Sequence, residues 1–434
     1  MIWSLREVVV RGSTTLFLAV VGLAPNQTRA ATLTTLVEFN FSNGAAPSGD
    51  VIADIDGNLF GTTSGGGAHG KGTVFEIAKT TRGYGTSPTI LVSFKGSDGA
   101  SPKAGLIADA AGNLFGTTSG GGADQQGTVF EIAKTRGGYS STPTTLISFS
   151  VSNGAAPSGR VIADAHGNLL GTTSAGGAHA DGTVFELVKT PGGYDKSLIT
   201  LVSFDFTNGA APLAGLIADA GGNLIGTTSR GGAYGQGTIF EIIKNPHGYA
   251  RSPITLVSFD PTHGAAPAAG VIADTSGNLF GTTSEGGAHG NGTVFEIAKT
   301  PDGYADSSTT LASFNGDDRV DPKAGVIVDG AGNLFGTTSA GGAQGYGTVF
   351  VIAKTPSGYA SEPTTLVSFD VANGAAPSSS LISEGYGNLI GTTSEGGRYR
   401  FYGTIFEITG SGFVPGAVPR AGNKVTSTPS RPRR

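Results

Sequence analysis

The fold is decided by one phrase of this chain, Gly112-Asn113-Leu114-Phe115-Gly116-Thr117-Thr118-Ser119, which is followed after a glycine-rich stretch by Gly127-Thr128-Val129-Phe130. The same phrase occurs seven times, with its asparagine every 55 residues, at Asn58, Asn113, Asn168, Asn223, Asn278, Asn333 and Asn388. A fixed period of this length is typical of a supersecondary unit that is stabilised by packing against its neighbours. The sequence therefore predicts a repeat architecture of seven like units.

Each unit contains four short apolar or β-branched runs, which in the second unit are 104–109, 114–118, 127–134 and 144–149. The turn at Gly112-Asn113 joins the first two runs as a tight hairpin. No stretch keeps a 3.6-residue apolar period over three turns, so the chain is predicted to be all-β. Four strands per unit is the count of a propeller blade, which predicts a seven-bladed β-propeller of four-stranded antiparallel blades. A β-solenoid is the competing architecture, but it requires neither the short hairpin nor a whole number of units.

Two phenylalanines recur in every unit, one in the third predicted strand and one in the fourth. They make up fourteen of the 23 phenylalanines: Phe75, Phe130, Phe185, Phe240, Phe295, Phe350 and Phe406, and Phe39, Phe94, Phe149, Phe204, Phe259, Phe314 and Phe369. Stacked sheets must fill a layer about 10 Å thick with large side chains. We therefore expect these rings to pack blade against blade rather than to bind a ligand.

The ends of the repeat suggest how the ring closes. The fourth-strand pattern first appears at 34–39, before any complete unit, and the last unit stops after its third strand at 404–408. The N-terminal segment can therefore supply the missing fourth strand of the last blade. The other phase, in which each blade starts with that strand and no exchange occurs, stays open.

Composition and the chain ends bound the class of protein. A net charge of -5 without clustered Lys or Arg gives no sign of a nucleic-acid surface, and the absence of cysteine excludes disulfides and thiolate metal sites. Residues 1–30 resemble a signal peptide, with Arg6 and Arg11 before an apolar run of about 11 residues, shorter than the ~20 needed to span a bilayer. We expect a propeller over 31–410 and a disordered basic tail over 411–434.

If the strands run from axis to rim in chain order, the loop between blades and the glycine-rich loop share one face, which is the expected binding surface. One position of the glycine-rich loop varies as His69, Asp124, His179, Tyr234, His289 and Gln344. Histidines in alternate blades cannot reach one zinc ion at ~2.1 Å except on the axis, so we expect solvated loop histidines and no metal site.

Two other patterns have a structural reading. An acidic residue ends the first strand of every unit, at Asp54, Asp109, Asp164, Asp219, Asp274, Asp329 and Glu384. A calcium loop would need a further acidic residue several positions on, so we expect these side chains to accept backbone N–H groups in the turn. The stretch 65–71 has the glycine and lysine spacing of a phosphate-binding loop, but Gly72 replaces the required Ser or Thr and no helix follows.

Two departures from the repeat mark the candidate ligand-binding residues. Four charges replace the usual inter-blade loop of the sixth unit, and one residue is inserted into the last glycine-rich loop. The candidates are Asp317, Asp318, Arg319 and Asp321, and Arg398, Tyr399, Arg400 and Tyr402. Arginines and aromatic rings beside acids suit a sugar, peptide or anionic ligand. Drift in loops under little packing constraint is the alternative, and the sequence identifies no catalytic residue.

The residues Gly112 to Thr118, Gly127 to Phe130 and Leu146-Ile147-Ser148-Phe149 resemble the GloVer tandem repeat of exported bacterial proteins, the choice-of-anchor family. The resemblance covers about 32–409 and implies a surface or secreted protein without an assigned activity, often tethered by a C-terminal sorting signal. Residues 410–434 lack a hydrophobic tail, which favours release or periplasmic residence over anchoring.

Two functions are therefore expected. The first is an exported, non-catalytic propeller that binds a protein or polysaccharide through its loop face, as a monomer without cofactor, metal, nucleic acid or a membrane span after signal removal. The second is a secreted carbohydrate-active enzyme, a hydrolase or lyase, with the segment 317–321 and Arg398 or Arg400 in its site.

Overall fold

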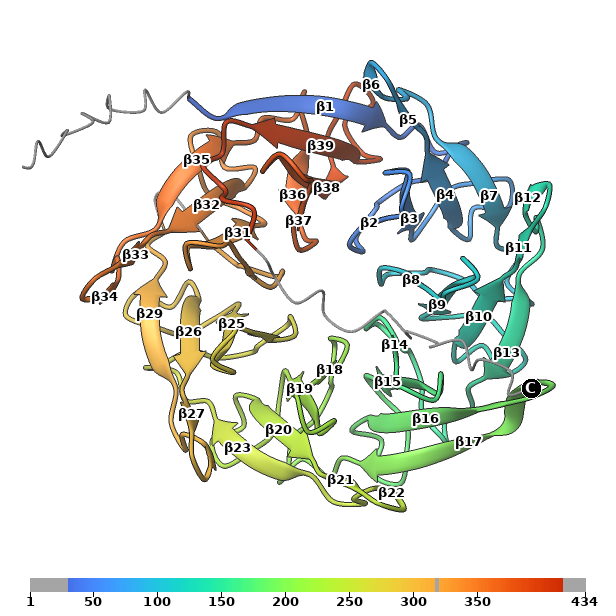
Figure 1. Cartoon of the computed structure of the whole chain (residues 1–434), viewed down its shortest axis with the longest axis horizontal. Coiled ribbons are helices and arrows are strands. Elements are labelled where there is room, and N and C mark those ends of the chain that lie inside the picture. Colours follow the sequence, from blue (N-terminus) through green and yellow to red (C-terminus); the bar gives the residue numbers. More distant parts are fainter. Residues whose placement is uncertain (1–29, 317–319, 417–434) are drawn as a thin grey trace, which may run out of the picture.

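The computed structural model describes residues 30–316 and 320–416 and shows seven antiparallel sheets arranged as blades around a central axis (Figure 1). Within these residues the chain forms strands and turns and no helix. In blades 1 to 6 the main strands run in chain order from axis to rim, and in blade 7 the outermost strand comes from the start of the chain, so the prediction of a seven-bladed β-propeller is confirmed. The expected leader and basic tail lie outside the described residues, except for residues 30 and 411–416.

We number the blades from blade 1, which contains β2, to blade 7, which contains β37. Equivalent strands occupy similar positions in each repeat. The innermost strands are β2 (Ile52–Ala53), β8 (Ile107–Ala108), β14 (Ile162–Ala163), β18 (Ile217–Ala218), β24 (Ile272–Ala273), β30 (Ile327–Val328) and β37 (Ile382–Ser383). The second strands are β3 (Leu59–Thr63), β9 (Leu114–Thr118), β15 (Leu169–Thr173), β19 (Leu224–Thr228), β25 (Leu279–Thr283), β31 (Leu334–Thr338) and β38 (Leu389–Glu395).

The third and fourth strands of the blades, which form the outer half of each blade, are also equivalent from blade to blade. The third strands are β4 (Thr73–Ile77), β10 (Thr128–Ile132), β16 (Thr183–Thr190), β20 (Thr238–Ile242), β26 (Thr293–Ile297), β32 (Thr348–Ile352) and β39 (Thr404–Thr409). The fourth strands are β7 (Thr89–Ser93), β13 (Thr144–Ser148), β17 (Gly193–Ser203), β23 (Ile254–Ser258), β29 (Thr309–Ser313), β35 (Thr364–Ser368) and, for blade 7, β1 (Thr32–Glu38). Blade 7 has one additional strand, β36 (Ala375–Pro377).

Small hairpins at the rim join the third and fourth strands. They are β5 (Lys79–Thr80) with β6 (Gly83–Tyr84), β11 (Lys134–Thr135) with β12 (Gly138–Tyr139), β21 (Lys244–Asn245) with β22 (Gly248–Tyr249), β27 (Lys299–Thr300) with β28 (Gly303–Tyr304), and β33 (Lys354–Thr355) with β34 (Gly358–Tyr359). In blade 3 the long strands β16 and β17 include this hairpin.

The innermost strand is shorter than expected. In blade 2 the run 104–109 pairs with β9 only at Ile107 and Ala108, because the preceding residues lie against the neighbouring blade close to the axis. A Cβ atom added to Gly105 would lie 2.7 Å from the carbonyl oxygen of Asp50 in blade 1. Crowding at the axis therefore limits this strand to two residues.

The two phenylalanine columns form the contacts between blades, as predicted. The fourth-strand ring of each blade packs on the third-strand ring of the next, and Phe94 and Phe130 have ring centroids 5.1 Å apart. Both rings are fully buried. Within blade 1, Phe75 also covers Gly61, where an added Cβ would lie 2.6 Å from the ring. The glycine of the repeated phrase is therefore required by the ring of the adjacent strand.

The ring closes through the N-terminal segment, as the offset of the repeat predicts. Strand β1 pairs antiparallel with β39, from Thr32 opposite Thr409 to Glu38 opposite Thr404. Val37 and Phe39 are buried in a cluster that includes Ile405 of blade 7 and Phe75 of blade 1. One strand thus completes the last blade and packs it against the first.

After β39, the chain continues to contact the propeller through Ser411 and Val414, which donate to Gly387 and Asp329. Phe413 is buried, and its ring centroid lies 5.1 Å from that of Phe335 in blade 6. At the boundary of blades 1 and 2, Tyr139 packs in the same way on Phe60, at 5.3 Å. Phe413 therefore takes the place of the hairpin tyrosine that blade 7 lacks.

Candidate binding face

Two sets of loops form one face of the disc, which we name the loop face: in blade 1 they are the inter-blade loop 40–47 and the glycine-rich loop 64–72. In each blade a residue with φ between 51° and 60° joins these loops to the preceding blade: Ala46, Ser101, Ala156, Ala211, Ala266, Asp321 and Ala376. The amide of Ala46 donates to the carbonyl of Tyr402 in blade 7 at 3.0 Å, and its carbonyl accepts the amide and hydroxyl of Ser64. Neighbouring groups therefore hold the strained backbone, and the loop face is a preorganised framework.

Asp321 occupies this left-handed position in blade 6. Its carboxylate lies 2.8 Å from Lys323 and accepts the hydroxyl of Ser339 at 3.0 Å. Aspartate tolerates the left-handed region better than most side chains, so the substitution for alanine fits its place in the backbone. The other candidates of this segment, Asp317, Asp318 and Arg319, lie outside the described residues.

The second predicted segment lies in the glycine-rich loop of blade 7, beside the inter-blade loop of blade 1. The amide of Arg398 donates to the carboxylate of Glu38 at 3.2 Å, and the ring of Tyr402 lies 5.8 Å from that of Phe41. Arg400 has a φ of 67° and forms the turn. Tyr399 and Phe401 are exposed, Phe401 by 73%. Aromatic side chains are thus concentrated where the ring closes.

Asp321 and residues 398–402 lie on different parts of the loop face. Asp321 lies at the boundary of blades 5 and 6, where its amide donates to Asn291, whereas residues 398–402 lie at the boundary of blades 7 and 1. Among the described residues, no hydrogen bond or ion pair joins Asp321 to Arg398, Tyr399, Arg400 or Tyr402. The candidates that lie within the described residues are therefore not joined in one pocket.

Large exposed apolar side chains are concentrated on the loop face. They come from the inter-blade loops and from the glycine-rich loops, and they are Phe41, Val151, Phe206, Tyr234, Tyr346, Tyr399 and Phe401. The position of Phe41 in the repeat carries glycine, valine, phenylalanine or proline in the other units. The sequence shows that this position varies, but only the structure shows which of these side chains are exposed to solvent.

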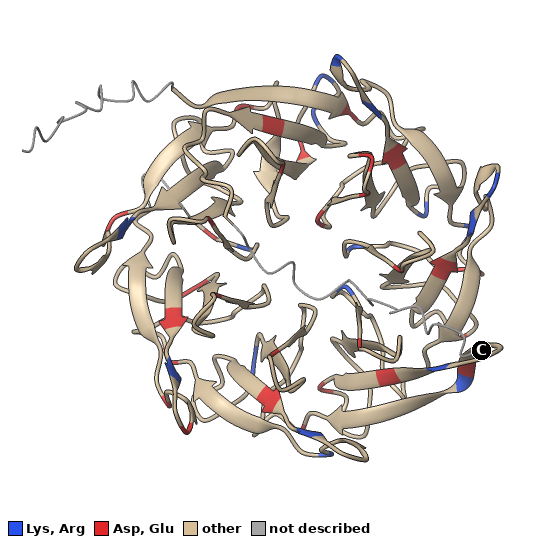
Figure 2. Cartoon of the chain, in the orientation of Figure 1, with Lys and Arg blue, Asp and Glu red and all other residues tan. Residues whose placement is uncertain are grey.

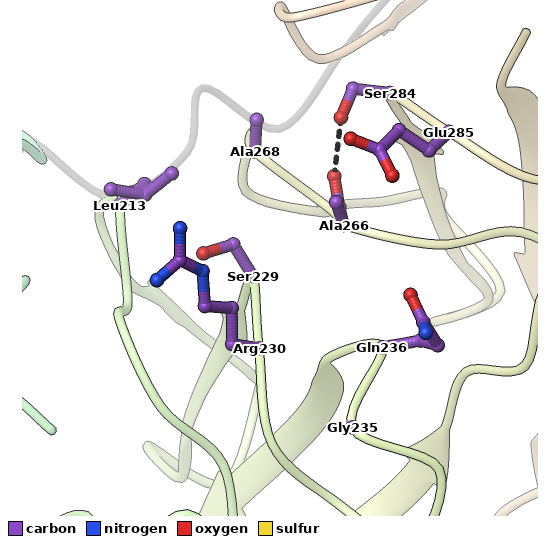
Figure 3. Close-up of a pocket in the computed structure, with 9 residues that line it drawn as sticks. All are labelled: Leu213, Ser229, Arg230, Gly235, Gln236, Ala266, Ala268, Ser284 and Glu285. Carbon is purple, nitrogen blue, oxygen red and sulfur yellow. Dashed lines mark hydrogen bonds between the residues drawn. The ribbon is translucent and has the colours of Figure 1, made fainter.

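A cavity of about 360 Å³ opens on the loop face between blades 4 and 5 (Figure 3). Arg230 and Glu285 stand on its opposite walls, together with Gln236, Ser229 and Ser284. Arg230 and Glu285 follow the repeated Thr-Thr-Ser, where most units have glycine or alanine. This departure from the repeat is the signal from which the cavity could have been suspected.

A second cavity, of about 260 Å³, lies along the axis and is lined by the innermost segments of the blades. Its charged residues include Asp50 and Arg160. The amide of Ser380 donates to Asp50 at 2.7 Å. Burial raises the pKa of the Asp50 carboxyl, and the positive charge of Arg160 and the hydrogen bonds from Ser380 oppose that shift.

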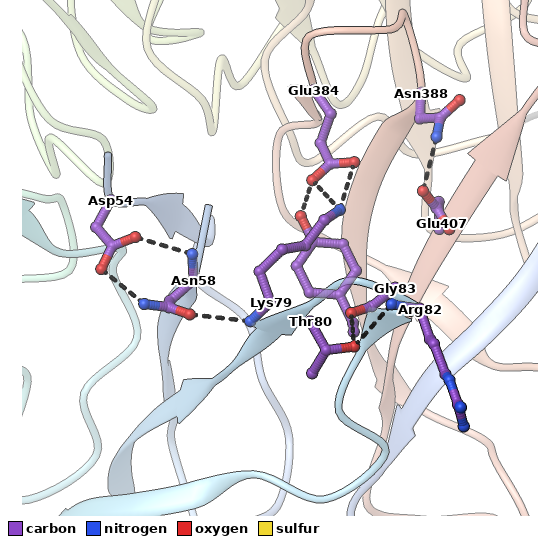
Figure 4. A network of polar contacts seen from close by, with 10 residues as sticks. Asp54, Asn58, Lys79, Thr80, Arg82, Gly83, Glu384, Asn388 and Glu407 are labelled. Carbon is purple, nitrogen blue, oxygen red and sulfur yellow. Dashed lines mark hydrogen bonds and ion pairs between the residues drawn. The ribbon is translucent and has the colours of Figure 1, made fainter. Parts of the chain in front are cut away.

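The opposite face contains a polar network that repeats around the ring (Figure 4). Asp54 accepts the backbone amides of Asp56 and Asn58 at 3.0 and 2.8 Å, and the Asn58 side chain accepts the backbone amide of Lys79 at 2.9 Å. The predicted turn role of the aspartate column is therefore confirmed. In blade 7, Glu384 takes the aspartate position and binds Lys79 at 2.7 Å and the hydroxyl of Tyr84.

In this network a lysine of one blade lies beside an acidic residue of the preceding blade, as Lys79 does with Glu384 and Lys244 with Asp164. Acidic residues lie on the third strand of every blade except the sixth, and basic residues lie at the rim hairpins (Figure 2). Burial raises the pKa of Glu186, nearby Asp164 raises it further, and Lys244 of blade 4 lowers it. Lys244 also lies 4.1 Å from the ring centroid of Tyr249. These contacts have a structural role at the blade boundaries, and their regular repetition argues against a single site there.

The loop histidines His69, His179 and His289 are exposed on separate blades. Within 30–316 and 320–416, no group of three His, Asp or Glu side chains is placed to hold a metal ion. The described chain also contains no helix long and apolar enough to cross a membrane.

A family model, the Gloeobacter/Verrucomicrobia repeat, matches the sequence over residues 19–199, 141–306 and 300–417. The chain belongs to this repeat family. No curated protein matches it at a significant level. The family and the propeller fold fit a scaffold or binding module.

Among solved structures, the fold is similar to one named "putative 6-phosphogluconolactonase from Bacteroides uniformis ATCC 8492". The TM-score is 0.50 at 11% sequence identity, over 73% of this chain and 84% of the other. At this identity the likeness shows the fold alone.

Proposed function

We propose that this protein is an exported, non-catalytic binding module that recognises a polysaccharide through its loop face. One observation carries the proposal: large exposed apolar side chains, mostly aromatic, are spread over that face on a hydrogen-bonded framework. Aromatic rings supply contact area at a low cost in conformational entropy and stack on the apolar faces of sugar rings.

The rings at the boundary of blades 7 and 1 form the strongest group. Phe41, Tyr399 and Phe401 are exposed, and Arg398 and Arg400 flank them with hydrogen-bond donors. The backbone is fixed on both sides, because the loop bonds to Glu38 and to Ala46. A preorganised surface loses little entropy when it binds an extended partner.

The alternative, a carbohydrate-active enzyme, has less support in the described residues. Glycoside hydrolysis by the common mechanism needs two carboxyl groups beside the scissile bond. The cavity on the loop face has one, Glu285, and Asp321 is bound to Lys323 and Ser339. The likeness to a lactonase structure supports the fold alone.

The proposal is tested by binding of the chain from residue 31 onward to an array of bacterial and plant polysaccharides. The Y399A/F401A variant should bind its glycan about fivefold to a hundredfold more weakly, since each lost aromatic contact contributes about 0.5–1.5 kcal/mol. A matched control is I55A/Y386A, which removes two exposed side chains from the opposite face. The control should bind like the parent chain and melt at the same temperature.

Absence of binding to every polysaccharide, or equal binding by both double variants, would refute this function. If the chain bound a protein and no polysaccharide, and Y399A/F401A lost that binding, the loop face would still be the binding surface but a polysaccharide would not be its ligand. Turnover of a bound glycan would favour the enzyme.

A further inference from the structure

The cavity between blades 4 and 5 has the features of a small-ligand site. Its volume of about 360 Å³ lies at the lower end of the ~300–1,000 Å³ typical of ligand pockets. Leu213 lines both this cavity and the axial cavity, so the site lies at the inner part of the loop face. The volume suits one small molecule or one residue of a chain.

Its charged groups are unique to this boundary. The position that follows Thr-Thr-Ser is Gly65, Gly120, Ala175, Arg230, Glu285, Ala340 and Glu395 around the ring. A basic residue therefore neighbours an acidic one only between blades 4 and 5.

Arg230 and Glu285 are both exposed, and neither charge is paired within the described residues. The side chains of Arg230 and Glu285 form no hydrogen bond or ion pair, with each other or with any residue of the described chain, although Figure 3 shows them facing one cavity. The side-chain amide of Gln236 also lacks a described partner. The cavity thus offers free donors on one wall and free acceptors on the other.

The backbone that carries these groups is fixed. Arg230 exchanges two hydrogen bonds with Ala210, at 2.7 and 3.0 Å, and Glu285 does the same with Ala265. The hydroxyls of Ser229 and Ser284 donate to the carbonyls of Ala211 and Ala266 at 2.9 and 2.8 Å. Their oxygens are therefore left as acceptors, and a ligand must supply hydroxyl or N–H donors to that wall.

These features select the class of ligand. The planar guanidinium group of Arg230 matches a carboxylate with two parallel hydrogen bonds. Glu285 disfavours a doubly charged anion such as phosphate but accepts hydrogen bonds from hydroxyl groups. A ligand with one carboxylate and several hydroxyls fits both walls.

We propose that this pocket binds a uronic acid residue of the polysaccharide, with Arg230 holding its carboxylate and Glu285 accepting bonds from its hydroxyls. The proposal rests on the proposed function and specifies its ligand as an acidic glycan. The exposed rings elsewhere on the loop face then contact neighbouring sugars, while the pocket selects a sugar residue that carries a negative charge.

The test measures calorimetric binding of homotrimers of glucuronic, galacturonic and mannuronic acid, of their methyl esters, and of acetate. At least one acidic trimer should bind, and its methyl ester should bind about tenfold to a hundredfold more weakly, the range expected when a charged hydrogen-bond pair is lost. R230A should lose the preference for the acid, and E285A should weaken both forms. Both variants should fold, because Ala175 and Ala340 occupy the same position in other blades. E395A is the matched control, since its blade has no basic neighbour there.

Equal binding of trimer and ester, or an unchanged preference in R230A, would overturn the pocket assignment. If Y399A/F401A still lost glycan binding in that case, the proposed function would stand. Binding of acetate as tightly as the trimer would show a simple anion site and reject a uronic acid site. Failure of every saccharide, acidic or neutral, would refute both proposals.

Discussion

The closing strand offers a quantitative test of the architecture. Phe39 follows β1, is 1% exposed, and packs on Phe75 of blade 1 with ring centroids 5.3 Å apart. Replacing a buried phenylalanine with alanine costs about 3–5 kcal/mol. A loss of about 4 kcal/mol is nearly a thousandfold change in the folding equilibrium and a large part of the ~5–15 kcal/mol of a typical protein.

The matched control is F149A. Phe149 holds the same repeat position after β13, is fully buried and packs on Phe185 at 5.1 Å. The rim hairpin β11–β12 connects β13 to its partner strand β10, whereas no such hairpin connects β1 to its partner strand β39. We therefore expect similar losses of stability in urea denaturation, but a different pattern of local opening.

Hydrogen exchange distinguishes the two variants. In F39A the amides of β39 (Thr404–Thr409) that pair with β1 should exchange up to about a thousandfold faster than those that pair with β38, because β1 can detach without global unfolding. In F149A these amides should change only as far as global stability does. A loss below about 1 kcal/mol in F39A, or unchanged protection of β39 in that variant, would refute the closure mechanism.

Two further predictions concern the polar network. N113A removes an amide that donates to Asp109 at 3.0 Å and accepts from Lys134 at 2.9 Å, so unfolding in urea should show a loss of about 1–3 kcal/mol. A111S, in the same turn, should stay within about 0.5 kcal/mol, and equal effects would contradict a role for the side chain. For pH, burial raises the pKa of Tyr304 and Tyr359 to about 12, above the ordinary value of 10. Because the unfolded chain then loses these protons first, the contribution of the two tyrosines to stability should be constant below pH 10 and fall between pH 10 and 12. The melting temperature of Y304F/Y359F should fall less over that range, and an identical profile would reject the assignment.

The repeated phrase predicts most of the fold because nearly every constant residue has a local cause. Gly61 lies under Phe75, Asp54 accepts amides within its own turn, and the two phenylalanine columns need only their spacing to be recognised. The sequence missed features that depend on the neighbouring blade. The tyrosine at position 139 has an equivalent every 55 residues in six of the units, but its packing on Phe60 of the neighbouring blade can be recognised only from the structure.

The loop face is less predictable for the same reason. Arg398 and Tyr402 stand out as departures from the repeat, yet Phe41, which lies beside Tyr402, is far away in sequence. Arg230 and Glu285 are single substitutions 55 residues apart, and only ring geometry makes them two walls of one cavity. Departures from a repeat can be read from the sequence, but which of them meet cannot.

Both ends of the folded chain are used at the last blades: β1 completes blade 7, and Phe413 fills the tyrosine position on blade 6. All other boundaries use the same contacts, so no single boundary specifies how many blades the ring contains. The copy number is instead enforced globally, because the two end segments can dock only when the accumulated rotation of the units equals one full turn. A gene that gained or lost one 55-residue unit would keep every local contact and both end segments, yet it would have to strain all boundaries equally or leave the ring open. Selection on closure therefore fixes the number of repeats while leaving each repeat free to vary its loops.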